Sequence, residues 1–239
     1  MTSSTARDQP VDPASSPHAR RTLGLAALTG LVLFVVSLGT FTPESSPTVG
    51  DATAAEIRRF AADNAGTLKL NQVAALIGIV LFVVFVAALA QLVRDRRPHS
   101  IVPDVLVMCG AVIAVHNALN TAVKTIFAFP HEVASVSDST IVAWYDLDGV
   151  VQWFGAMVRV APCMVLIAAF SIFALRTRLM ARWVSWAGLA VAAGGLATAV
   201  DVADVLGPVG LVPLFGWWLW PLAVGGALGV RWLKARRTR

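Results

Sequence analysis

Five polar side chains recur at helical spacing within the apolar stretch from residue 101 to residue 129. They are His116, Asn117, Asn120, Thr121 and Lys124. In an α-helix this spacing places all five on one face. These residue types donate and accept hydrogen bonds, and Lys124 adds a positive charge. The rest of the stretch is apolar, so the pattern predicts a polar helical face that is turned away from lipid.

A second apolar stretch, from residue 148 to residue 175, carries a matching set. Asp148, Gln152 and Arg159 fall on one helical face, and Asp201 follows near the end of a later apolar stretch. An arginine near the centre of a membrane costs about 2.5–3.5 kcal/mol on an insertion scale, so Arg159 is expected to face the interior of a bundle or water. The predicted polar core or ligand-binding set is His116, Asn117, Asn120, Lys124, Asp148, Gln152, Arg159 and Asp201.

Arg159 is expected to find partners inside the protein, because an unpaired buried charge is strongly destabilising. Lys124 lies in the outer third of its stretch, so it either pairs in the same way or snorkels outward to the interface. Amide oxygens and carboxylates on the neighbouring stretches supply such partners. The expected partners of Arg159 are Asn117, Asn120 and Asp201. The expected partners of Lys124 are Asp146, Asp148 and Asp201.

Three kinds of function are compatible with this polar face. The first expectation is a non-enzymatic integral membrane protein, structural or accessory, in which the polar groups form an internal network. The second is a transporter or ligand-binding protein for a small solute or anion, with a polar cavity in its outer half. The third is a membrane-embedded enzyme acting on lipid or quinone. A dry and fully paired polar cluster favours the structural or accessory protein. A continuous polar cavity favours the transporter or ligand-binding protein, and an apolar groove that reaches His116 favours the enzyme.

Sequence motifs for catalysis and for cofactors are absent. No GxSxG, HExxH, P-loop or GxGxxG pattern occurs. The two cysteines, Cys109 and Cys163, lie inside apolar stretches without the spacing of a metal site. We therefore expect no catalytic residue, no cofactor and no metal. Nucleic-acid binding is not expected either, because the basic residues behind the net charge of +5 flank the apolar stretches.

The composition is that of a polytopic α-helical membrane protein. Hydrophobic residues make up 57% of the chain and charged residues only 14%, and the mean hydropathy is +0.72. Such a chain has too little charge to cover the surface of a soluble domain of this length. Arginine greatly outnumbers lysine, and alanine and valine are abundant, which is typical of a GC-rich bacterial genome.

Charge and hydropathy together predict an all-α bundle of six transmembrane helices, arranged as three antiparallel hairpins. Basic residues flank every second connection, and the other connections are neutral or acidic. By the positive-inside rule, both termini of this multi-pass protein are cytoplasmic in a bacterial plasma membrane. The expected spans are residues 22–41, 70–93, 101–129, 148–175, 183–205 and 214–232.

Residues 1–19 are rich in Ser, Thr and Pro and are expected to form a disordered cytoplasmic tail, with the bundle in residues 20–239. The sequence Thr53-Ala-Ala-Glu56 has the form of a capping box and predicts a short amphipathic helix in the first outer loop. Tryptophans near the ends of the spans, Trp220 among them, are interpreted as an aromatic belt. Gly225 and Gly229 form a GxxxG pattern, a candidate contact for a homodimer in the lipid bilayer.

The first third of the chain resembles a bacterial family. It is similar to bacterial six-helix membrane proteins known only as domains of unknown function. The similar features are an arginine-flanked first span, the Thr-Ala-Ala-Glu-Ile helix start, and a second span that opens with Leu70-Asn71-Gln72 and ends with Leu92-Val93-Arg94. The similarity covers mainly residues 20–97 and is compositional. It implies six helices and brings no activity and no site residue.

Overall fold

The structure is a computed structural model, and it describes residues 17–40, 46–199 and 211–237. Every regular element in these ranges is a helix, so the expected all-α class is confirmed. The α-helices are α1 (Pro17–Ser37), α2 (Ala54–Asp63), α3 (Ala65–Arg94), α4 (Val102–Lys124), α5 (Pro130–Ser135), α6 (Asp138–Thr177), α7 (Arg182–Ala199) and α8 (Leu211–Arg237). Two 3-10 helices, η2 (Leu38–Thr40) and η3 (Thr125–Ala128), extend α1 and α4.

Four helical segments of the described residues are long and apolar enough to cross a membrane. This property is compatible with a membrane protein. The remaining two expected spans correspond to α7 and α8, and for these two helices spanning stays a prediction. The four segments are Pro17–Thr40, Ala54–Arg94, Val102–Ala128 and Val158–Thr177.

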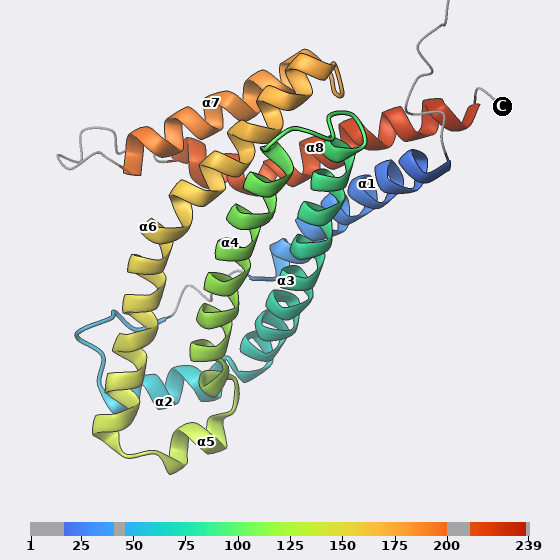
Figure 1. The fold of residues 1–239 in the computed structure, drawn as a ribbon. Coiled ribbons are helices and arrows are strands. Elements are labelled where there is room, and N and C mark those ends of the chain that lie inside the picture. The colour runs from blue at the N-terminus through green and yellow to red at the C-terminus, as the bar shows by residue number, and fades with distance from the viewer. Residues whose placement is uncertain (1–16, 41–45, 200–210, 238–239) are drawn as a thin grey trace, which may run out of the picture.

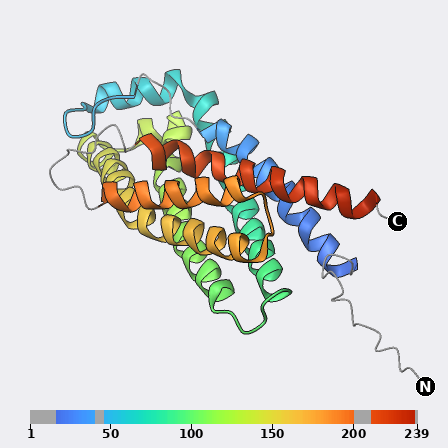
Figure 2. The same cartoon turned by 90° about the horizontal axis from the view of Figure 1, so that it is seen from above.

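The six long helices form a closed circuit in which each helix contacts the next. The order of contacts is α1, α3, α4, α6, α7 and α8, and α8 returns to α1. Helices α3, α4 and α6 run side by side, while α1, α7 and α8 cross one end of these three at an incline (Figures 1 and 2). Helix α1 inclines along α3, with Gly30 beside Phe85, Gly78 beside Val36 and Gly39 beside Ala74. The arrangement therefore has a crowded end and a more open end.

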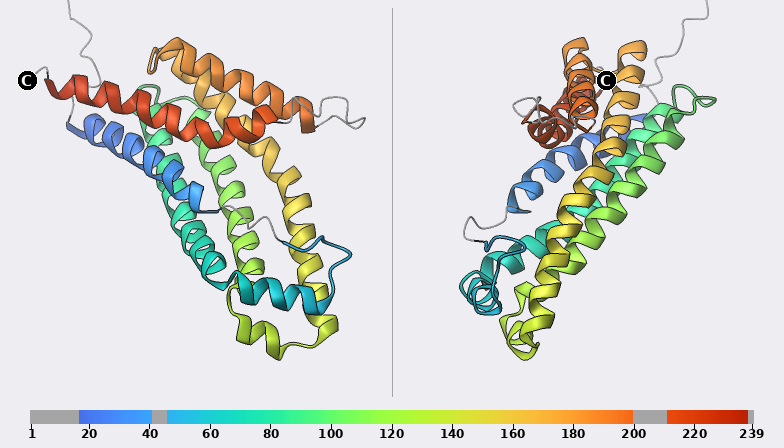
Figure 3. Two further views of the ribbon diagram at one scale, coloured as in Figure 1. Left: turned by 180° about the vertical axis from the view of Figure 1, so that it is seen from behind. Right: turned by 90° about the vertical axis from the view of Figure 1, so that its left-hand side faces the viewer.

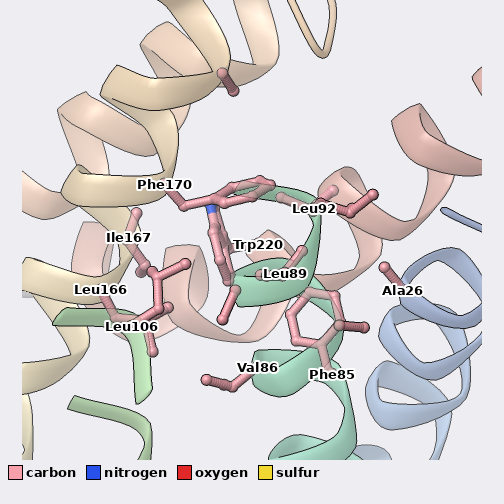
Figure 4. Close-up of a cluster of buried hydrophobic side chains, with 14 of the residues drawn as sticks. Ala26, Phe85, Val86, Leu89, Leu92, Leu106, Leu166, Ile167, Phe170 and Trp220 are labelled. Atoms are coloured by element: carbon pink, nitrogen blue, oxygen red, sulfur yellow. The ribbon is translucent and has the colours of Figure 1, made fainter. Parts of the chain in front are cut away.

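The crowded end contains the main hydrophobic core (Figure 4). Trp220 of α8 lies at its centre, with ring centroids 5.9 Å from Phe85 and 6.0 Å from Phe170 in edge-to-face contacts. Its side chain is only 4% exposed. The assignment of Trp220 to an aromatic belt is therefore corrected, because the tilt of α8 carries this residue inward. Trp183 and Trp186, at the start of α7, are exposed as a belt requires.

A second, smaller core lies at the opposite end, where α2 and α5 pack against the beginning of α6. The predicted capping box is confirmed: Thr53 accepts a hydrogen bond from the backbone N–H of Glu56, and the Glu56 carboxylate accepts from the backbone N–H of Thr53. This cap fixes the start of α2. Ile57 and Phe60 then bury the apolar face of the helix in the second core.

Helix α6 is longer than expected. The sequence predicts a loop up to Leu147, whereas the helix begins at Asp138 and continues for 40 residues to Thr177. The Ser137 side chain caps it by accepting a hydrogen bond from the backbone N–H of Thr140. At about 1.5 Å per residue the helix is about 60 Å long, twice the thickness of a membrane core. Its first turns pack against α2, and Ile141 and Tyr145 there share the second core with Val133 of α5.

The basic connections gather at one end of the molecule. The start of α1, the α3–α4 connection, the α6–α7 connection and the end of α8 all lie at the crowded end, and α2 and α5 lie at the other (Figures 1 and 3). This segregation has the form that the positive-inside pattern predicts. The expected tail lies largely in residues 1–16, outside the described residues, and α1 begins at Pro17.

Candidate functional site

A polar hollow of about 270 Å³ lies beside the second core, between the first turns of α3, the last turns of α4 and the first third of α6. Its floor carries amides and two opposite charges, and its rim carries Phe60, Phe127 and Tyr145 from the second core. The polar side chains from the three helices that line this first hollow are Asn71, Gln72, Asn120, Thr121, Lys124, Asp148 and Gln152.

A second hollow of about 510 Å³ continues toward the crowded end. Asn117 and Arg159 add polar groups that the first hollow lacks, and Phe82, Trp217 and Trp218 supply apolar walls. The two hollows have five lining residues in common, and we refer to them together as the polar cavity. The common residues are Thr40, Ala75, Asn120, Thr121 and Gln152.

Helix α4 presents four of its five predicted polar residues to the polar cavity. At 100° per residue, Asn117, Asn120, Thr121 and Lys124 cover an arc of about 100°, and His116 falls about 40° outside that arc. The structure accordingly buries His116 but places it on neither hollow. The expectation of one face for all five residues is corrected for His116, which lay at the edge of the pattern.

Helix α6 contributes a carboxylate, an amide and a guanidinium. Asp148 is 7% exposed and accepts a 2.7 Å hydrogen bond from Gln152 Nε2, one turn further along the helix. Arg159 donates from Nη1 to Asn117 Oδ1 of α4 at 3.3 Å. Asn117 is one of the partners that the sequence predicts for Arg159. These two hydrogen bonds hold part of the polar set in place.

Several polar atoms of the cavity have no partner. Lys124 has no hydrogen bond or ion pair with any residue of the described ranges, although Asp148 is near enough to exert an electrostatic attraction. Asn120 Oδ1 and Asp148 Oδ1 are buried and accept no hydrogen bond from the part of the chain that the structure describes. Buried acceptors without a donor cost about 1–3 kcal/mol each. The cluster is therefore only partly paired, and the cavity leaves an ammonium group and two acceptors available to an occupant.

The segment from residue 46 to residue 51 covers the first hollow and is tied to α6. Tyr145 donates from its hydroxyl to the Pro47 carbonyl at 2.6 Å, and the Gly50 N–H donates to Asp146 Oδ1 at 3.1 Å. Asp146 therefore bonds this segment and not Lys124. Gly149 lies directly beneath the Val49 side chain, where any β-carbon would collide.

The burial of Tyr145 alters its acidity. This residue precedes both the expected span and the spanning segment of α6. Burial, followed by the charges of Asp148 and Asp146, raises the pKa of Tyr145 to about 12. The phenol therefore stays neutral and keeps its hydrogen bond to the covering segment at physiological pH.

Sequence reasoning missed two groups of lining residues. Asn71 and Gln72 open the second apolar stretch, and Gln72 Oε1 lies 3.5 Å from the Thr125 hydroxyl at the end of α4. Two consecutive amides at the start of an apolar run are a signal that could have found them. The aromatic rim could not be found this way, because Phe60 and Tyr145 are brought together only by α2 folding back.

Asp201, the remaining predicted site residue, lies outside the described residues. Within the described ranges, no group of three or more His, Cys, Asp and Glu side chains is placed to hold a metal ion. No protein family, curated protein or solved structure matches this chain.

Proposed function

We propose that this chain is an integral membrane protein that binds a small polar anion in the polar cavity between α3, α4 and α6. The observation that carries the proposal is Lys124, a cation that lines the cavity and has no hydrogen bond or ion pair among the described residues. An internal structural network would be expected to pair this charge, because leaving it unpaired is costly. A ligand that supplies the missing anion offsets that cost.

The charges of the cavity suggest the chemical class of the ligand. Lys124 and Arg159 contribute two positive charges and Asp148 one negative charge. A monoanion balances the excess. The unbonded Asn120 Oδ1 and Asp148 Oδ1 require hydrogen-bond donors. A small solute that carries one carboxylate or phosphate together with an amino or hydroxyl group satisfies both demands.

Ligand binding can be tested on the purified full-length protein. Thermal stabilisation and equilibrium binding would be measured with acetate, lactate, glycine, glutamate, sulfate and inorganic phosphate. For a ligand that stabilises the protein, Lys124→Gln is expected to weaken binding by about tenfold or more, because a hydrogen bond to a charged group contributes about 1.5–3 kcal/mol. Lys69→Gln is the matched control, since Lys69 is exposed and lies outside the cavity. Equal binding by both variants would contradict the assignment of Lys124.

The competing function is an internal network that only fixes helix packing, and the Arg159–Asn117 hydrogen bond favours it. Single cysteines at Asn120, Gln152 and Arg159, in a background without Cys109 and Cys163, distinguish the two. A membrane-impermeant thiol reagent added outside is expected to label all three positions if the cavity holds water. Arg159→Lys serves as the folding control for the deepest position. Labelling that stops at Asn120 in a folded protein would refute the binding site.

We also propose the finer topology that the sequence predicts. In this proposal α7 and α8 complete six spans in a bacterial plasma membrane, and the crowded, basic end is cytoplasmic. The cavity then lies in the outer half, below α2 and α5. Transport by so small a bundle would require a dimer. The sequence predicts the dimer contact on the Gly225/Gly229 face of α8. This face contacts α1 within the chain, so a dimer through it would require α1 to move.

A further inference from the structure

An apolar groove with a basic rim runs between α1 and α8, at the crowded end and away from the polar cavity. Its volume is about 750 Å³. The floor is made of small residues, Gly24, Ala27 and Gly229. Exposed leucines of α1 form one wall, and Trp232 and Leu233 of α8 form the other. Three arginines stand at one end of the groove: Arg20, Arg21 and Arg236.

We propose that this groove binds one anionic phospholipid of the leaflet that faces the crowded end. The arginines hold the phosphate group, and one acyl chain lies on the small residues between the two helices. This inference is independent of the polar cavity, which shares no residue with the groove.

The shape of the groove is built by specific contacts. Gly24 allows the Trp232 indole to approach α1, since a β-carbon at position 24 would stand 2.9 Å from Trp232 Nε1. The guanidinium of Arg236 then stacks on the same indole, 4.0 Å from its centroid. This cation–π contact fixes Arg236 at the mouth of the groove. The Trp232 indole therefore joins the cationic rim to the apolar wall of the groove.

The length of the groove matches a lipid chain. On α1 it extends from Arg21 to Leu31, which is about 15 Å at 1.5 Å per residue. Half of a hydrocarbon core of about 30 Å is the same length. Leu25 and Leu28, between these two residues, are 46% and 61% exposed. Charge at one end and apolar surface over one leaflet's depth suit a phospholipid better than a soluble anion, which would leave the apolar wall uncovered.

The test uses the full-length protein reconstituted in vesicles of phosphatidylcholine and phosphatidylglycerol in equal amounts. Mild detergent extraction followed by native mass spectrometry counts each lipid that remains bound. The wild-type protein is expected to retain one phosphatidylglycerol in preference to phosphatidylcholine. The double variant R21Q/R236Q is expected to lower this preference by about fivefold for each arginine, since a basic residue near an anionic surface contributes about 1 kcal/mol. The control R182Q/R237Q removes the same charge from the same end, outside the groove.

A second variant tests the apolar floor without changing charge. Gly229→Leu fills the groove, and its β-carbon would make only an ordinary 3.7 Å contact with Ala27. It is expected to abolish retention of phosphatidylglycerol. Gly226→Leu is the control, because Gly226 lies about one helical turn from Gly229 and a β-carbon there would meet no atom within 4 Å. The proposal would be overturned if the arginine variant and its control retained phosphatidylglycerol equally, or if Gly229→Leu did not reduce this retention. It would also be overturned if a second copy of the chain were bound in place of lipid.

Discussion

At the scale of single residues, the polar cavity is defined by incomplete pairing. Gln152 satisfies one oxygen of Asp148, and Asn117 satisfies one nitrogen of Arg159. The other oxygen of Asp148 is buried without a partner among the described residues. The half-buried Lys124 also has no hydrogen bond or ion pair among them. A protein interior seldom tolerates such a state, because buried polar groups are nearly always bonded. This imbalance is the reason to look for a ligand.

Tyr145 gives a residue-scale prediction that depends on pH. It is the single tyrosine of the chain, so phenolate absorbance reports it alone. The folded protein is expected to ionise with a pKa of about 12, against about 10 for the unfolded chain. Since the folded pKa is raised, the stability contributed by the neutral phenol is complete below about pH 10 and is lost as the pH rises through about 12.

The matched variants for this titration are Tyr145→Phe and Asp146→Asn. Tyr145→Phe is expected to abolish the signal and to destabilise the protein by about 1 kcal/mol, through loss of the hydrogen bond to Pro47. Asp146→Asn is expected to lower the pKa of Tyr145, because it removes a nearby negative charge. A folded-state titration near pH 10 would show that the covering segment does not bury the phenol.

At the scale of elements, the crossing of α1 and α8 determines the shape of the crowded end. Gly30 and Gly225 meet at this crossing, where a β-carbon on Gly225 would stand 2.9 Å from the Ala27 carbonyl oxygen. The backbone on both sides leaves no flexible atom to move aside. Small residues permit such close approach of helices in membranes. The GxxxG pattern thus serves a contact within the chain, whether or not it also serves a dimer.

Two adjacent glycines of α8 allow the tight crossing of α1 and α8 to be tested by substitution. Gly225→Ala is expected to destabilise the protein by about 1–3 kcal/mol through overpacking. Gly226→Ala is expected to be neutral or stabilising by up to about 1 kcal/mol, since its β-carbon meets nothing within 4 Å and alanine favours a helix. Thermal unfolding in detergent measures both. Equal effects of the two substitutions would rule out the tight α1–α8 crossing.

At the scale of the whole molecule, the circuit of helices holds a polar cavity between two hydrophobic cores of different size. The tilted helices α1, α7 and α8 fill the crowded end with the main core, and α2 and α5 cover the other end with a small one. The polar cavity lies between the two cores. A solute that enters from the α2 side avoids the main core but has to pass the covering segment of residues 46–51 and the second core.

Topology is the prediction that belongs to this scale. Single cysteines would be placed at His99 and Ala181, in the basic connections. Two more would be placed at Ser139, in the first turn of α6, and at Val209, between α7 and α8. In intact cells, an impermeant thiol reagent is expected to label Ser139 and Val209, and to label the other two only after permeabilisation. Labelling of Val209 from the inside would show that α7 and α8 do not span, which leaves the four spans supported by length and composition.

Several features followed from the sequence alone, because they depend on local physics. Apolar length and charge segregation predicted the helices, and Thr53 and Glu56 predicted a cap that the structure contains. The spacing along α4 selected the four residues through which this helix lines the cavity. In each case the information lies within one element, where helical periodicity and capping chemistry operate.

The tertiary structure decided what depends on the relation between elements. Trp220 enters the core because α8 is tilted across α3 and α6, and His116 leaves the polar face because the neighbouring helices meet α4 over a narrower arc. The start of α6 became helical because α2 and α5 bury it. Which charges remain unpaired is also a three-dimensional fact, since pairing depends on distances between helices that no spacing within one helix encodes.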